Sequence, residues 1–174
     1  MSHNTSIDHL VVPGTFDPVT FGHLDVIRRA RRLAPKVTVA VADSKTKRGT
    51  GRTFTLDERV LLVRESIIEL GLPQDIDVVP FRGLLIDFCR EVGAGGVVKG
   101  LRAMTDFEYE LQQANLNQHM APDVESIFVM SSPQYGYVSS SIVRELASFG
   151  TDVSSLVPCV VAAALEERYA ELAE

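Results

Sequence analysis

The stretch that decides the fold is residues 7–25, which read IDHLVVPGTFDPVTFGHLD. Its first part, residues 7–12, is an apolar run, and the breaker string PGTFDP at residues 13–18 follows at once. This pattern predicts a short buried strand that enters a turn-rich loop. From residue 22 to residue 33 the spacing becomes helical, and one face of the predicted helix carries Leu24, Ile27, Ala30 and Leu33.

The alternation of strand and helix continues along the chain. Further strands are predicted at residues 37–42, 76–79, 96–99 and 125–130. Helices are predicted at residues 55–70, 84–92, 105–119, 139–148 and from 158 onward, and capping boxes begin those at Thr55 and Thr105. Strands separated by helices predict an α/β fold, a Rossmann-like open domain whose five-stranded parallel sheet is covered by helices on both faces. We expect one domain over residues 1–174, with a C-terminal helix at about 158–173 that packs on it or on a neighbouring subunit.

Composition excludes several classes of protein. The 174 residues are 45% hydrophobic and 23% charged, which fits a globular domain that folds without disulfides or a structural metal. No apolar run could span a bilayer and the N-terminus is not a secretory signal, so we expect a cytoplasmic protein with no membrane partner. Cys89 and Cys159 lie in apolar surroundings and are expected to be buried free thiols. The net charge of −6 argues against nucleic acid as a partner.

Open parallel sheets bind ligands beyond the carboxyl ends of their strands. The important loops are therefore residues 13–22, 43–54, 80–83, 100–106 and 131–139. Neither GxxxxGK[ST] nor a complete GxGxxG after a strand is present, which disfavours a P-loop enzyme and an ordinary NAD dehydrogenase. Gly22 and His23 instead stand at the start of the first helix, where free N–H groups attract anions. The histidines form no metal-binding pattern.

Three blocks of sequence, in order along the chain, resemble one known family. They are residues 13–25, residues 99–102 (KGLR) with 106–110 (DFEYE), and residues 138–144 (VSSSIVR). Together they resemble the bacterial-type phosphopantetheine adenylyltransferases of the (H/T)xGH nucleotidyltransferase superfamily. The resemblance implies adenylyl transfer from ATP to 4′-phosphopantetheine, giving dephospho-coenzyme A and pyrophosphate, the penultimate step of coenzyme A biosynthesis. It also implies Mg²⁺ that accompanies ATP, and a homohexamer.

The same resemblance implies roles for individual residues. The catalytic residues would be His23, Thr15, Lys47 and Arg102, with His23 stabilising the transition state. ATP would be bound by Thr15, Phe16, His23, Gly100, Leu101, Arg102, Glu110, Tyr135, Gly136, Tyr137, Val138, Ser139, Ser140 and Ser141. Phosphopantetheine would be bound by Thr15, Lys47, Leu84, Leu85, Lys99 and Asn117.

Some positions leave alternatives open. The family usually has Asn-Pro ahead of its lysine, whereas residues 43–47 read DSKTK here, so Lys45 competes with Lys47 for the acceptor phosphate. Residues 49–51 (GTG) read as an insertion relative to the family, and Phe21 and Gly136 also depart from its pattern. Arg102 and Glu110 could instead form a structural ion pair, and the three serines could serve only as a helix cap.

Three functions fit these residues to different degrees. The first is adenylyl transfer to phosphopantetheine. The second is the same fold acting on another acceptor, such as nicotinate mononucleotide or glycerol phosphate, and the block KGLR…DFEYE argues against it. The third is a nucleotide-sensing module without catalysis, against which the intact Thr15, His23, Arg102 and serines argue.

Overall fold

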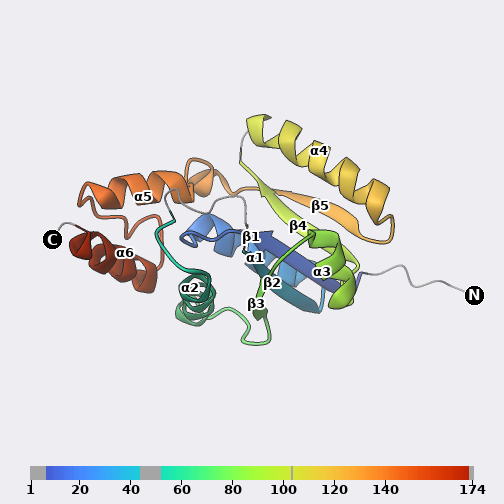
Figure 1. Ribbon diagram of the computed structural model, residues 1–174, viewed down its shortest axis with the longest axis horizontal. Helices are drawn as coiled ribbons and strands as arrows, with labels where there is room; N and C mark the ends of the chain where they lie inside the picture. Colours follow the sequence, from blue (N-terminus) through green and yellow to red (C-terminus); the bar gives the residue numbers. More distant parts are fainter. Residues whose placement is uncertain (1–6, 44–51, 103, 173–174) are drawn as a thin grey trace, which may run out of the picture.

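The computed structural model describes residues 7–43, 52–102 and 104–172 (Figure 1). Its strands are β1 (His9–Gly14), β2 (Lys36–Ala42), β3 (Asp77–Phe81), β4 (Gly96–Leu101) and β5 (Glu125–Met130). All neighbouring strands pair in parallel, in the order β3-β2-β1-β4-β5. The predicted α/β fold with a five-stranded parallel sheet is therefore confirmed.

The helices also follow the predicted order, with ends that differ by a few residues. They are α1 (Phe21–Leu33), α2 (Leu56–Glu69), α3 (Leu85–Glu91), α4 (Met104–Met120), α5 (Ser140–Ser148) and α6 (Cys159–Glu171), with a 3₁₀ turn, η2 (Pro133–Tyr135), before α5. The capping box at Thr55 is confirmed, because Glu58 N–H donates to Thr55 Oγ1 and Thr55 N–H donates to Glu58 Oε2. Helix α4 begins at Met104, one residue before the predicted start at Thr105, and the Thr105 side chain of the predicted capping box lies outside the described part of the structure.

Alternating side chains of the strands pack against helices on opposite faces of the sheet. In β1, Leu10 and Val12 belong to a core with α1 and α2, whereas Val11 belongs to a second core with α3 and the end of α4. Both faces of the sheet are therefore covered, as residues buried on each side of a parallel strand require. Helices α5 and α6 lie on the left of Figure 1, with α5 above α2, and α6 packs against α2 and α5.

Two residues that belong to apolar patterns in the sequence, Leu33 and Cys159, lie at the surface. Leu33 is 55% exposed, because it ends α1 and the next residue, Ala34, turns into the core instead. Cys89 is buried as expected, but Cys159 is exposed. Cys159 is the first residue of α6, and the core-facing positions of that helix are taken by Val161 and Leu165. An apolar sequence neighbourhood therefore did not establish that the thiol at residue 159 is buried.

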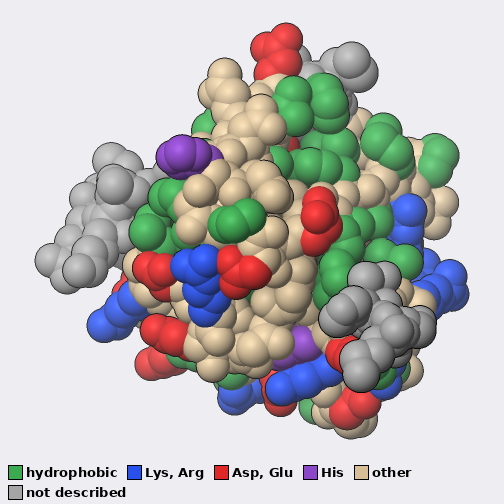
Figure 2. Space-filling view, turned by 90° about the vertical axis from the view of Figure 1, so that its right-hand side faces the viewer, with side chains coloured by type: hydrophobic (Ala, Val, Ile, Leu, Met, Phe, Trp, Pro, Cys, Tyr) green, Lys and Arg blue, Asp and Glu red, His purple; other side chains and the backbone are tan. Residues whose placement is uncertain are grey.

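The surface combines charged and apolar regions. On the face shown in Figure 2, hydrophobic side chains gather toward the top, where α4 lies, and charged side chains of both signs lie below them. Exposed apolar side chains of α4 are Phe107, Tyr109, Leu111 and Leu116. In the part of the chain that the structure describes, none of the helices combines the length and the apolar character needed to cross a membrane.

A buried histidine links the first strand to its neighbours. His9 Nε2 lies 2.8 Å from Thr38 Oγ1 on β2, and His9 Nδ1 lies 3.1 Å from the Val92 carbonyl oxygen. The carbonyl can only accept, so Nδ1 carries the proton and Nε2 accepts from the threonine hydroxyl. Burial of the ring, with the nearby Lys36, lowers the pKa of His9 below its ordinary value of 6.5.

This histidine makes the stability of the fold sensitive to acid. The unfolded chain protonates His9 near its ordinary pKa, whereas the folded chain resists, so stability is complete above that value and falls as the pH drops below it. We predict that the free energy of unfolding falls more steeply between about pH 7 and pH 5 in the wild type than in His9→Gln, whose side chain does not titrate. Urea unfolding at a series of pH values measures this, and parallel curves would contradict it.

Candidate active site

A cavity of about 620 Å³ opens at the carboxyl ends of β1 and β4. These strands are neighbours in the sheet, yet the chain reaches β4 only after extending the sheet through β2 and β3 on the other side of β1. Open α/β sheets bind ligands at such a switch point. The cavity wall combines the β1–α1 loop, the end of β4, one side of α4 and the start of α5.

The β1–α1 loop is packed tightly around Phe16. This residue is buried and has a backbone φ of 50°, a left-handed conformation that is strained for a bulky side chain. A Cβ atom on Gly14 would lie 2.7 Å from Phe16 Cζ, so only glycine fits beneath the ring. The edge of the same ring meets the His23 imidazole, with centroids 5.1 Å apart. Phe16 therefore packs against the His23 ring and restricts its position.

Helix α1 begins with a capping box in which His23 takes the third helical position. Thr20 Oγ1 accepts from His23 N–H at 3.4 Å, and Thr20 N–H donates to His23 Nδ1 at 3.0 Å. Because a backbone N–H can only donate, Nδ1 must be the unprotonated nitrogen of the neutral ring. The proton is therefore on Nε2, the other edge of an imidazole that lines the cavity. The helix cap thus fixes a hydrogen-bond donor at the site.

The protonation state of His23 is also set by its surroundings. Burial of the ring, reinforced by the positive charge of Arg102, lowers the pKa of His23 from 6.5 to about 4. The imidazole is therefore neutral at pH 7 and can donate from Nε2 without carrying a charge.

Two cations enter the cavity from the end of β4. Lys99 Nζ lies 2.6 Å from Glu110 Oε2 on α4, and both side chains line the cavity. Arg102 donates to the Val138 carbonyl oxygen at 3.1 Å, which joins the β4 end to the segment before α5. Glu110 thus forms its ion pair with Lys99, rather than with Arg102 as one alternative had it. Between these residues, a Cβ on Gly100 would lie 2.7 Å from Val26 Cγ2, so glycine lets β4 approach α1.

The start of α5 contributes helix N–H groups and hydroxyls. Ser139 Oγ caps α5 by accepting from Ile142 N–H at 3.2 Å, and Ser140 Oγ donates to the Pro18 carbonyl oxygen at 2.8 Å. Ser139, Ser140 and Ser141 all line the cavity. The cap predicted as an alternative for these serines is therefore present, and it presents the N-terminus of α5, which favours anions, to the cavity.

Comparison with known proteins places this geometry in a family. Residues 11–146 match the model of the family described as Cytidylyltransferase-like. The chain is 49% identical over 161 residues to a phosphopantetheine adenylyltransferase of Thiobacillus denitrificans, covering 92% of this chain and 97% of the relative. A phosphopantetheine adenylyltransferase of Frankia casuarinae is 49% identical over 160 residues, covering 91% and 96%. The chain belongs to the phosphopantetheine adenylyltransferase family.

A solved structure shares the fold at much lower identity. It is a bifunctional NMN adenylyltransferase/ADP ribose pyrophosphatase from Francisella tularensis, in complex with AMP and a manganese ion. The TM-score is 0.68 at 15% identity, over 95% of this chain and 52% of that chain. This likeness bears on the fold alone, and it agrees with the Rossmann-like α/β sheet.

The site residues predicted for this chain, apart from Lys47, fall into two groups. Those that line the cavity are Thr15, Phe16, His23, Leu85, Lys99, Gly100, Arg102, Glu110, Val138, Ser139, Ser140 and Ser141. Those placed elsewhere are Leu84, Leu101, Asn117, Tyr135, Gly136 and Tyr137. Leu84 is 55% exposed and precedes α3, whereas Asn117 lies on α4 beside a shallow crevice that also touches Lys99 and Glu110. Lys47 and its alternative Lys45 lie outside the described residues.

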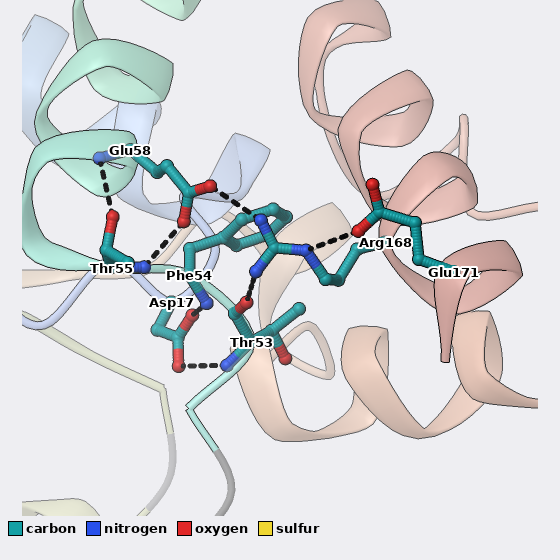
Figure 3. Close-up of polar contacts among 7 residues, drawn as sticks. All are labelled: Asp17, Thr53, Phe54, Thr55, Glu58, Arg168 and Glu171. Carbon is teal, nitrogen blue, oxygen red and sulfur yellow. Dashed lines mark hydrogen bonds and ion pairs between the residues drawn. The ribbon is translucent and has the colours of Figure 1, made fainter. Parts of the chain in front are cut away.

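Contacts beside the cavity anchor the chain just after the segment that contains Lys47 (Figure 3). The buried Asp17 carboxylate accepts from Thr53 N–H at 3.2 Å and from Phe54 N–H at 3.0 Å. Arg168 of α6 donates to the Thr53 carbonyl oxygen and to Glu58, and its guanidinium lies 5.3 Å from the centroid of the Phe54 ring. The loop after β1 and the last helix therefore hold the same short segment.

Sequence reasoning missed several residues that support the site. Asp25 is buried on α1 and accepts from Ser132 Oγ and Arg28 NH2, each at 2.7 Å, which ties α1 to the segment after β5. Arg144 of α5 donates to the Asp17 carbonyl oxygen. Asp17, Asp25 and Arg144 all stand in the quoted sequence blocks, so the blocks pointed to them although the residue types gave no specific role.

No metal cage of protein side chains is apparent at this site. Within residues 7–43, 52–102 and 104–172, no group of three or more His, Cys, Asp or Glu side chains could hold a metal ion. The cavity carboxylate of Glu110 is already paired with Lys99. A cation that entered with a nucleotide would therefore depend mainly on phosphate oxygens.

The state of His23 can be tested directly. We predict that nitrogen NMR of the protein without ligand shows a neutral imidazole protonated on Nε2 at pH 7, with a titration midpoint of about 4. The variant Arg102→Met removes a charge that opposes protonation, so its midpoint moves up toward the ordinary value. A wild-type midpoint near 6.5 would contradict the effect of burial and Arg102 on the ring, and a proton on Nδ1 would show that the helix cap does not determine the tautomer.

Proposed function

We propose that this chain transfers the adenylyl group of ATP to 4′-phosphopantetheine, giving dephospho-coenzyme A and pyrophosphate. The observation that carries the proposal is the neutral His23, whose Nδ1 is occupied by the Thr20 N–H and whose Nε2–H is left for a ligand. Lys99, Arg102 and the N-terminus of α5 meet that donor in one cavity. The names of the curated relatives support phosphopantetheine as the acceptor.

For this reaction the protein must position the two substrates and stabilise negative charge on their phosphates, and it need not supply a nucleophile. The acceptor phosphate is ionised at pH 7 and attacks the α-phosphorus of ATP in line with the bond to the leaving pyrophosphate, so no general base is required. The attack places negative charge on the α-phosphate oxygens and then on pyrophosphate. Donors that are already held in place stabilise this charge without reorganising during the reaction. His23 Nε2–H, fixed by the helix cap, is such a donor.

The cavity divides naturally between two substrates. The nucleotide would lie against the start of α5 and Arg102, with Arg102 in contact with its phosphates. The acceptor side comprises Lys99, Leu85 and Thr15, with Lys47 as the second acceptor-phosphate cation. Glu110 Oε2 lies 2.6 Å from Lys99 Nζ, so an acceptor phosphate that binds Lys99 must either share the ammonium group with this carboxylate or displace the carboxylate from it.

Further properties of the family are part of the same proposal. Mg²⁺ would accompany ATP and help to neutralise its phosphates, and the enzyme would work in the cytoplasm. A homo-oligomer, a hexamer by family resemblance, would bury part of the apolar surface of α4. The exposed Phe107, Leu111 and Leu116 support burial of this helix against another copy.

The decisive experiment follows pyrophosphate release from ATP with three acceptors offered separately. We expect turnover with phosphopantetheine and at most traces with nicotinate mononucleotide or glycerol 3-phosphate. Turnover with either of the other two acceptors, and none with phosphopantetheine, would move the chain to another branch of the fold. Nucleotide binding without turnover on any acceptor would favour a sensing role.

Replacing His23 tests its role in the transition state. We predict that His23→Ala lowers kcat by about two to three orders of magnitude, as loss of a preorganised donor does, while ATP binding weakens only slightly. Stopped-flow turnover and calorimetric ATP binding measure the two effects. The variant Thr20→Ala removes the hydroxyl that caps His23 N–H and contacts Nδ1 at 3.0 Å but keeps the backbone N–H that donates to Nδ1, so we expect it to lower kcat less than His23→Ala does. Equal losses of binding and turnover in His23→Ala would contradict the role.

The two candidate lysines for the acceptor phosphate, Lys45 and Lys47, are two positions apart in the sequence and can be compared directly. We predict that Lys47→Ala raises the KM for phosphopantetheine by about tenfold or more, whereas Lys45→Ala changes it by a factor of about two, because only one of them contacts the phosphate. Steady-state kinetics at saturating ATP measure both values. The reverse order would assign the contact to Lys45.

A further inference from the structure

A fully buried arginine lies behind the β1–α1 loop. Arg59 of α2 has no exposed surface, and its NH1 group donates to the Thr15 carbonyl oxygen at 2.6 Å and to the Ala42 carbonyl oxygen at 3.0 Å. These carbonyls belong to the chain just after β1 and to the end of β2. One guanidinium therefore joins the carboxyl ends of two neighbouring strands, directly beside the cavity that Thr15 and Ala42 line.

A contribution to stability does not by itself explain why an arginine is buried at this position. Its Nε and NH2 groups are buried and have no hydrogen-bond partner among the residues that the structure describes. Unsatisfied buried donors lower stability, and a buried positive charge adds to that cost. Burial lowers the pKa of Arg59, with Arg52 acting in the same direction, yet an arginine keeps its proton at neutral pH. A residue that costs stability next to a cavity calls for a functional explanation.

The hydrogen bond at Thr15 determines which way one peptide group faces. The Thr15 carbonyl and the Phe16 N–H belong to the same trans peptide, so they point in opposite directions. The carbonyl points at Arg59, which does not line the cavity, and the N–H therefore points away from Arg59. Within the described part of the chain, the Phe16 N–H donates to no protein acceptor. The strained φ of 50° at Phe16 shows that this orientation is imposed by the surroundings.

We propose that Arg59 is a positioning residue, which holds the Thr15–Phe16 peptide so that the Phe16 N–H donates to a phosphate oxygen in the cavity. The hydrogen bond from a guanidinium also polarises the carbonyl, which makes the N–H of that peptide a stronger donor. The buried positive charge behind the peptide favours an anion in front of it. The inference rests on the proposed function, since it assumes that the cavity binds phosphate groups.

Pyrophosphate is the probe, because its binding can be followed without any turnover. In the wild type, we expect pyrophosphate to shift the amide NMR signal of Phe16 downfield. In Arg59→Met the dissociation constant for pyrophosphate rises by about 10- to 100-fold and the Phe16 signal no longer responds. Arg59→Lys keeps the charge but lacks the planar guanidinium, so it recovers only part of the affinity.

The matched control is Arg64, another arginine of α2 whose NH2 group donates to a strand carbonyl, that of Val78, at 2.7 Å. It does not line the cavity. We expect Arg64→Met to lower the melting temperature yet leave pyrophosphate affinity and the Phe16 response within a factor of about two of the wild type. If Arg59→Met does not fold, Arg59→Lys against Arg64→Met gives the same comparison.

Several results would overturn the proposal. They are a wild-type Phe16 amide that ignores pyrophosphate, no pyrophosphate binding to the wild type, wild-type affinity in the Arg59 variants, or equal losses in the Arg59 and Arg64 variants. Failure of the proposed adenylyl transfer is a separate result. A chain that adenylates no acceptor but binds pyrophosphate through Phe16 would keep this inference and lose that function.

Discussion

The reciprocal hydrogen bonds between Thr20 and His23 are the contact on which the rest of the site depends. They begin helix α1, and they also decide which imidazole nitrogen carries the proton. A side chain used in this way cannot rotate without breaking the helix start, so the donor is held by secondary structure. Phe16 packs beneath the ring and Gly14 makes room for Phe16. The start of α1 and the orientation of the donor are thus set by the same pair of side chains.

The remaining elements of the site converge on that loop from distant parts of the sequence. Ser140 and Arg144 of α5 donate to the carbonyls of Pro18 and Asp17, and Arg59 of α2 donates to the Thr15 carbonyl. The carbonyl groups of Thr15, Asp17 and Pro18 are therefore bound by protein donors, so these oxygens do not repel an anionic ligand in the cavity. A chain with a net charge of −6 still presents Lys99 and Arg102 to its cavity. Local charge, rather than the overall sign, suits the site to small phosphate compounds.

The sequence predicted the fold well because strand and helix periodicities alternate cleanly and each apolar run is short. It also located the cavity, since the loops after parallel strands must share one edge of the sheet. It failed where the outcome depends on packing between elements. Leu33 and Cys159 belong to apolar patterns but lie past the edge of the core. The roles of Asp25 and Arg59 depend on partners more than forty residues away or on burial, which periodicity does not contain.

The contacts in Figure 3 bear on which insertions and deletions the sequence of this chain can tolerate. Ala42, before residues 44–51, is held by Arg59, and Thr53 and Phe54, after them, are held by Asp17 and Arg168. Because both ends are held, the number of residues between them can change without moving the strands of the sheet. Added residues then cost only the small loop-closure entropy, a few tenths of a kcal/mol for a short insertion. The anchors thereby allow residues 44–51 to differ in number without altering the cavity wall behind them.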